Sequence, residues 1–433
     1  MLIVTGAVSV LVDETTEGPA DLVLDGGRVV AVTAPGGGAS AARELDPEAE
    51  LQTLSAEGCV VTAGLVNAHH HLFQSSFRTL PGTRGVAMRD WLPTMAAAYA
   101  AAGIDAETAA TAASIGVAEG LLSGVTTVAD HQLTWPAGSD RLADTVALAE
   151  ATAGVARQLG SRVVFVRGSA RDDPQEAAAS AEAIVAALLR DAPGGVSGDG
   201  MLQVAIGPAG VHSDSRETFE LLGEVAARHG LRRRTQANEQ VDVEIALERY
   251  GRRPLDLLDE WGWLAPDVTL AHLCAVTPEE IRRLAAAGIT GTHAPGCDLP
   301  MGWGIAPVAA LRDAGIVVGL GTSGGGSNDA GHLLADARLA MQVAPLVGPP
   351  IPARAVLGMA TEGSAIGLGR PELGHLRVGA AADLALWDVT GIPDAGVADP
   401  VAGLLWANPG RRPKHVLVAG VVVVLDGQLV ALS

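Results

Sequence analysis

Residues 60–74 read VVTAGLVNAHHHLFQ, an apolar run that ends in three consecutive histidines. Side chains alternate between the two faces of a β-strand, so His69 and His71 point to one side and the histidine between them to the other. Two imidazoles on one face at the carboxyl end of a strand provide half of a tetrahedral metal site. A packing role is the simpler alternative, and residues elsewhere in the chain have to distinguish the two.

This strand, at 59–68, is the first of eight apolar stretches that alternate with alanine-rich helical stretches. The alternation predicts an α/β protein with a (β/α)8 TIM barrel. A doubly wound sheet is the alternative, but no GxGxxG opens a helix after the first strand, and polar residues follow many separate strands. The other strands are predicted at 124–130, 162–168, 202–208, 231–236, 268–273, 289–293 and 317–321, and helices at 105–123, 140–159, 174–191, 215–229, 277–287 and 331–344.

Both ends of the chain carry short β-patterned runs instead. ADLVLDGGRVVAVT near the start and HVLVAGVVVVLDGQLVAL at the end each contain a DG turn between two apolar runs. We therefore expect residues 1–58 and 371–433 to form one composite β-sandwich domain beside a barrel domain at 59–370.

Composition excludes several classes of function. The chain has 433 residues, 29 basic against 49 acidic, and this excess of negative charge argues against nucleic acid or an anionic membrane as a partner. Cys59, Cys274 and Cys297 form no disulfide framework, which is typical of a reducing cytoplasm. We expect neither a signal peptide nor a membrane span. The single lysine, Lys414, excludes Schiff-base chemistry and a P-loop in the body of the chain.

Strand five ends in the sequence RTQANE, where Arg234 and Gln236 share a face and Glu239 follows the strand. A carboxylate at this place can reach a reacting water, and partial burial adjusts the pKa of such a group for proton transfer. The alternative for Glu239 is a solvated loop position.

Polar residues also follow strands six, seven and eight. His272 interrupts the apolar stretch LAHLCA, either as a buried structural histidine or as a site residue. Strand seven ends with His293 and Asp298, and strand eight with Ser323 and Asn328 around three glycines that let a ligand approach the backbone. The carboxyl ends of barrel strands are where such enzymes keep their chemistry.

The chain resembles the amidohydrolase superfamily, in the branch with one metal that deaminates or dehalogenates nitrogen heterocycles. The resemblance is carried by GLVNAHHHLFQ, GVTTVADHQ, HAPGCDLPMGWG and GLGTSGGGSNDAGHLLADARLA, with Arg78 and the segment Asp90-Trp91-Leu92, and it covers nearly the whole chain. It is nearest to the s-triazine hydrolases of the atrazine chlorohydrolase type, followed by 8-oxoguanine and pterin deaminases. It implies a homodimer and a small heterocyclic substrate.

In that family the metal is held by the strand-one histidine pair, a strand-five histidine and a strand-eight aspartate. Gln236 and Ser323 stand at the last two positions, and Arg234 takes a place that is often histidine. The resemblance implies a metal site of His69, His71 and Gln236, catalytic Glu239, His272 and Ser323, and substrate contacts from Gln74, Trp91, His131, Arg234, His293, Asp298, Trp303 and Asn328.

These departures weaken the expected metal site. A glutamine offers only a carbonyl oxygen where Zn²⁺ prefers imidazole, and no carboxylate remains among the ligand positions. The guanidinium of Arg234 adds positive charge nearby and repels a dication. One divalent metal, Zn²⁺, is expected, with lower affinity than in the family.

Three functions fit the residues. The first is an amidohydrolase, of the deaminase or dechlorinase type, that cleaves a carbon–nitrogen or carbon–halide bond of a small nitrogen heterocycle through metal-activated water, with Glu239 as general acid/base. The second is a metal-independent lyase, cyclase or isomerase on the same barrel that uses Glu239 and His272. The third is a non-catalytic paralogue that only binds a ligand.

Overall fold

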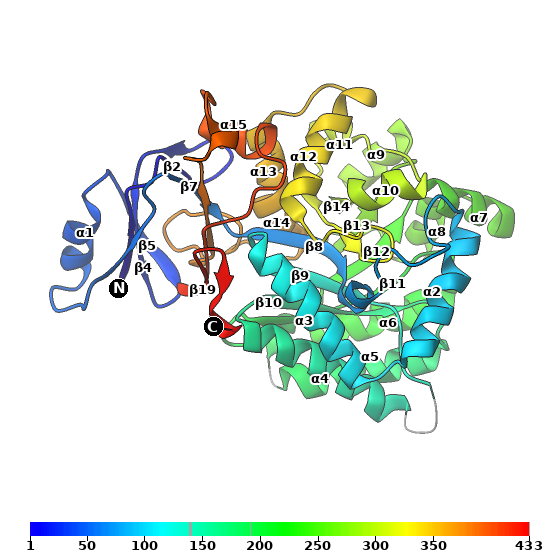
Figure 1. The fold of residues 1–433 in the computed structure, drawn as a ribbon. Helices are drawn as coiled ribbons and strands as arrows, with labels where there is room; N and C mark the ends of the chain where they lie inside the picture. The colour runs from blue at the N-terminus through cyan, green and yellow to red at the C-terminus, as the bar shows by residue number, and fades with distance from the viewer. Residues whose placement is uncertain (138–140, 191, 433) are drawn as a thin grey trace.

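The computed structural model describes residues 1–137, 141–190 and 192–432, and its centre is a parallel β-sheet that curls on itself (Figure 1). The strand order is β15-β14-β13-β12-β11-β10-β9-β8-β16. The two end members, β15 and β16, are consecutive parts of the eighth strand: β15 pairs with β14 and β16 pairs with β8. The eighth strand therefore joins the two edges of the sheet and closes a barrel. Its members are β8 (Leu65–His71), β9 (Val125–Gln132), β10 (Arg162–Ser169), β11 (Leu202–Pro208), β12 (Arg233–Ala237), β13 (Val268–His272), β14 (Thr290–His293), β15 (Val318–Leu320) and β16 (Ser323–Gly324).

The eight predicted strands are confirmed, with one correction at the first. The stretch 59–68 divides at Gly64: β7 (Cys59–Ala63) pairs antiparallel with β17 (Leu384–Asp388) outside the barrel, and only β8 enters the barrel. A Cβ atom on Gly64 would lie 2.3 Å from the side chain of Thr126, so the chain passes between the two sheets where no other residue fits. The pattern of apolar residues does not reveal this because both halves are buried.

Helices follow the strands and lie outside them (Figure 1). The six predicted helices are confirmed within the described residues, whereas Asp140, Asp191 and Ser433, which end predicted segments, lie outside them. No helix in the described part of the chain has the length and apolar character needed to cross a membrane. The helices of the barrel region are α2 (Met88–Ala102), α3 (Ala106–Leu122), α4 (Arg141–Leu159), α5 (Pro174–Leu189), α6 (Arg216–His229), α7 (Gln240–Tyr250), α8 (Pro254–Glu260), α9 (Pro278–Ala286), α10 (Pro295–Met301), α11 (Val308–Asp313), α12 (Leu333–Val343), α13 (Ala353–Gly358) and α14 (Ser364–Gly367).

The barrel strands bury both faces. Val164 and Val166 of β10 belong to a small inner cluster, whereas Val163 and Phe165 belong to the large cluster that includes the surrounding helices. This alternation explains why the strands read as continuous apolar runs. Leu368, just after α14, also joins the inner cluster, so this segment covers the amino-terminal end of the barrel and leaves the carboxyl end for the site.

Two further sheets contain the ends of the chain, and Figure 1 shows the first strands, in blue, near the last ones, in red, at one side of the barrel. Apolar side chains of both sheets share one hydrophobic cluster, which holds them together. The four-stranded sheet has the order β5 (Arg28–Thr33), β4 (Asp21–Asp25), β1 (Leu2–Thr5), β6 (Gln52–Ser55); the seven-stranded sheet has the order β20 (Gln428–Leu429), β19 (Val421–Leu425), β18 (His415–Val418), β17, β7, β2 (Ser9–Leu11), β3 (Glu17–Gly18). Helices α1 (Gly38–Leu45) and α15 (Pro400–Trp406) accompany these sheets.

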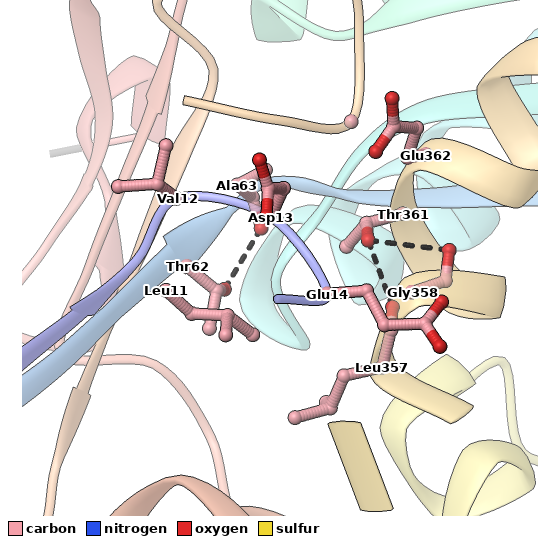
Figure 2. A pocket seen from close by; sticks show the side chains of 11 residues that line it. Leu11, Val12, Asp13, Glu14, Thr62, Ala63, Leu357, Gly358, Thr361 and Glu362 are labelled. Atoms are coloured by element: carbon pink, nitrogen blue, oxygen red, sulfur yellow. Dashed lines mark hydrogen bonds between the residues drawn. The ribbon is translucent and has the colours of Figure 1, made fainter. Parts of the chain in front are cut away.

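A narrow cavity lies where the seven-stranded sheet meets the segment that follows α13 (Figure 2). It is lined by residues 11–14 and 62–63 and by Leu357, Gly358, Thr361, Glu362 and Gly374. The hydroxyl of Thr361 donates to the backbone carbonyl of Leu357 at 2.8 Å. None of the residues predicted for the active site lines this cavity, so it is a junction between the two parts of the molecule.

A buried ion pair ties the barrel to the seven-stranded sheet. Arg162, at the start of β10, donates through Nε and Nη2 to the carboxylate of Asp383 at 2.7 and 2.9 Å. The side chains are only 5% and 3% exposed, so each charge depends on the other for its solvation.

Asp383→Ala is expected to lower the free energy of unfolding by about 3–5 kcal/mol, because it leaves the guanidinium of Arg162 buried without a counter-charge. Urea-induced unfolding measures this. Glu279→Ala is the matched control, since its ion pair with Arg282 is two-thirds exposed and contributes little. Equal effects of the two substitutions would contradict the assignment.

Candidate active site

Four histidine rings meet at the carboxyl end of the barrel; we call His69, His71, His131 and His272 the histidine cluster. The ring centroid of His69 lies 4.9, 5.8 and 5.2 Å from those of the other three, in that order. The histidine between the first two, His70, turns away and meets the backbone oxygen of Ser323, as strand alternation predicts.

Two members of the histidine cluster, His69 and His71, are neutral at neutral pH. Burial, with the neighbouring imidazoles, lowers the pKa of His69 well below its ordinary value, and lowers that of His71 to about 3. The Nδ1 of His71 donates to the backbone oxygen of His131 at 2.6 Å, which leaves Nε2 with the lone pair. The Nε2 of His69 is buried and has no hydrogen-bond partner. These two nitrogens are therefore in the state that a metal ligand requires.

Strand β12 contributes Gln236 and Arg234 on the same inner face. Gln236 donates through its amide nitrogen to the backbone oxygen of Ala209 at 3.2 Å and turns its oxygen to Nε2 of His272, 3.0 Å away. Arg234 donates through Nη2 to the backbone oxygen of Ala68, and its Nη1 is buried with no partner. Burial lowers the pKa of Arg234 to about 9, yet the group stays charged at neutral pH and disfavours further positive charge on His69.

Glu239 lies directly after β12, at the start of α7, and is 1% exposed. Both carboxylate oxygens lack a hydrogen-bond partner, and Oε1 lies 3.8 Å from Nε2 of His272. Burial is the largest cause that raises the pKa of this carboxyl to about 7. A group that changes protonation near neutral pH suits proton transfer, and the solvated-loop alternative does not describe Glu239.

His272 ends β13 and is held from two sides. Its Nδ1 meets Oδ1 of Asp298 at 2.6 Å, and the ring of Trp303 packs perpendicular to it at a centroid distance of 5.3 Å. Burial opposes a charge on His272, but the carboxylate of Asp298 outweighs burial and raises the pKa. The second oxygen of Asp298 lies 3.7 Å from Nδ1 of His293. Asp298 and His293 therefore border His272.

The loop after the eighth strand is braced by residues that were predicted to contact substrate. Gln74 accepts from the backbone nitrogen of Gly326 at 3.1 Å, and Trp91 donates to the oxygen of the same residue at 3.1 Å. Asn328 donates to the backbone oxygen of Thr322 at 2.9 Å. Burial raises the pKa of the Cys297 thiol, and the nearby hydroxyl of Ser323 opposes this. Their substrate or catalytic roles stay predictions.

Two residues that sequence analysis missed stand beside Glu239. His212 donates through Nδ1 to Oδ1 of Asp242 at 3.2 Å, and ligand atoms of His212, Glu239 and Asp242 all lie within 4.8 Å of one another. Burial opposes a charge on His212, but its bond to Asp242 raises the pKa to about 8. The position of His212 just past the end of β11 is a signal that could have found it.

The donor atoms fit a divalent metal only in part. Nε2 of His69 has no partner, Nε2 of His71 keeps its lone pair, and the oxygen of Gln236 is a weak third donor. In the part of the chain that the structure describes, the only groups of three His, Cys, Asp or Glu within 4.8 Å are His272–Cys297–Asp298 and His212–Glu239–Asp242, and neither contains the pair. A metal at this pair would be held less tightly than by three imidazoles and a carboxylate.

Comparison with known proteins identifies the family of this chain. The sequence pattern of the amidohydrolase family matches residues 60–423. The chain is 35% identical to 8-oxoguanine deaminase from Pseudomonas aeruginosa, over 95% of this chain and 91% of the relative. It is 31% identical to isoxanthopterin deaminase from an unknown prokaryotic organism, over 88% and 84% of the two chains. The crystal structure of atrazine chlorohydrolase TrzN from Arthrobacter aurescens, complexed with zinc, superposes with a TM-score of 0.88 at 33% identity and covers 99% of this chain and 96% of its own. The chain belongs to the amidohydrolase family.

Proposed function

We propose that this protein is a hydrolase that replaces a substituent on a small nitrogen heterocycle with the oxygen of water. The similar proteins are named for 8-oxoguanine, isoxanthopterin and atrazine. All three molecules carry an amino group or a chlorine on a ring carbon next to a ring nitrogen. Attack of water on such a carbon, followed by loss of ammonia or chloride, is one chemistry for all of them. This shared chemistry favours a hydrolase over a metal-independent enzyme or a binding paralogue.

The observation that carries the proposal is the state of Glu239. This carboxyl is buried, has two free oxygens and lies 3.8 Å from His272. With a pKa near 7 it is able to accept a proton from water and return one during the reaction. His272, held in place by Asp298, is positioned to orient the water that Glu239 deprotonates.

We propose that His69 and His71, with the oxygen of Gln236, hold one zinc ion. Zinc there would act as a Lewis acid that makes water more acidic. Trp303 and His131 border this position and would exclude bulk water from it. The shared cluster of the two terminal sheets supports a β-sandwich domain, and a cytoplasmic homodimer remains part of the proposal.

Glu239→Gln is expected to lower kcat by on the order of 10²–10⁴, because an amide cannot accept the proton of the attacking water. Release of ammonia from 8-oxoguanine and isoxanthopterin and of chloride from atrazine measures this. Glu244→Gln, on the exposed side of α7, is the matched control and should keep its activity. Full turnover by Glu239→Gln would assign the proton transfer to another group.

The double change Gln236→His and Ser323→Asp is expected to tighten zinc binding at least about tenfold, or about 1.4 kcal/mol, because it adds an imidazole and a carboxylate beside the pair. Competition with a chromogenic chelator measures the affinity. Gln240→His, on an exposed position, is the control. An unchanged zinc affinity would mean that these two positions do not face His69 and His71.

A further inference from the structure

A second titratable side chain, the imidazole of His212, lies near Glu239 but comes from a different element. His212 belongs to the loop after β11, and Asp242 belongs to the first turn of α7. Their hydrogen bond of 3.2 Å brings the imidazole to Glu239, since ligand atoms of all three residues lie within 4.8 Å of one another. Neither His212 nor Asp242 has a part in the reaction as proposed above.

Asp242 is fully buried and itself held in place. Its Oδ2 accepts from the backbone nitrogen of Asn238 at 2.8 Å, and its Oδ1 accepts from Nδ1 of His212. The carboxylate therefore determines both the orientation of the imidazole and which nitrogen carries the bonded proton. The bond to Asp242 uses Nδ1, which leaves the other nitrogen, Nε2, available to a substrate. An aspartate that orients a histidine with a free Nε2 is a recurrent arrangement for acid/base catalysis.

The charges around the imidazole favour its protonated form. The titratable groups that face it are the carboxyls of Asp242, Glu239 and Asp214, which favour a charge on it, and the imidazole of His272, whose charge it opposes. The three carboxyls outweigh that repulsion, and Arg234 acts instead on His69 and His131. His212 thus carries a proton to give, while the neighbouring Glu239 has two free oxygens to accept one.

We propose that His212, oriented by Asp242, is a catalytic acid that protonates the leaving nitrogen and so enables the enzyme to release an amine, which, unlike a halide, needs a proton to leave. The inference rests on the proposed hydrolase. Water forms a bond to the ring carbon and gives one proton to Glu239. As the carbon–nitrogen bond breaks, its electron pair goes to nitrogen, which takes the Nε2 proton of His212 and leaves as ammonia. The proton on Glu239 then restores His212, which is close enough for transfer through one water.

The proposal is tested by comparing two leaving groups on the same ring, because a departing amine needs a proton and chloride does not. His212→Gln is expected to lower kcat for an amino-substituted heterocycle by on the order of 100-fold, and to leave kcat for the chloro-substituted form of the same ring nearly unchanged. Retained chloride release also shows that the variant folds. His229→Gln is the matched control, since this histidine pairs with Glu182 at the end of α6, away from the site.

A second measurement uses only the unmodified enzyme. Across substrates with amine leaving groups of increasing basicity, kcat is expected to change little, since the proton arrives as the bond breaks. Loss of both activities in His212→Gln, loss of neither, or a steep fall of kcat with amine basicity would each overturn the assignment. A wild-type enzyme that acts on chloro- but not amino-substituted rings would also overturn it, and turnover of neither would contradict the proposed function itself.

Discussion

The amide of Asn67 joins the first strand of the barrel to the last. Its nitrogen donates to the hydroxyl of Thr322 at 2.8 Å, and its oxygen accepts from the backbone nitrogen of the same residue at 3.2 Å. Gly321 makes this approach feasible, because a Cβ atom there would lie 2.7 Å from the backbone oxygen of His69. Closing the sheet at this point brings the carboxyl ends of all its strands to one rim. The contacts of His69 with His131 and His272 join the first strand to the others across that rim.

Burial then determines the charges at the rim. The same loss of water lowers the pKa of His69 and His71 and raises that of Glu239, so the site contains neutral imidazoles beside a carboxyl that titrates near neutral pH. The resemblance implies an aspartate at the strand-eight position, where this chain has Ser323, and the carboxylate that hydrogen-bonds the cluster is Asp298, 2.6 Å from Nδ1 of His272. Arg234, also buried, adds a positive charge. The electrostatic balance of the site therefore differs from one built around four strong metal ligands.

Most of the barrel could be predicted because each strand and helix is marked by its own local sequence pattern. Strands buried on both faces read as apolar runs, and alanine-rich helices separate them, so the eight strands were found within a few residues. The break at Gly64 was missed, since a change of sheet leaves no mark when both halves are apolar. Glu239 and His272 were identified from their places at strand ends. His212 and Asp242 were not, because His212 lies in a loop and Asp242 has the pattern of an ordinary acidic residue at a helix start.

The order and spacing of residues alone determined the barrel, the inward-facing pair His69 and His71, and the likeness to one enzyme family. Which side chains share a hydrogen bond was decided only in three dimensions. Gln236 turns its oxygen to His272, Asp298 bonds the same ring, and His212 lies near Glu239 across 27 positions of sequence. The physical reason is that these partners come from different strands and loops. Their distances, burial and charges exist only after the barrel has closed.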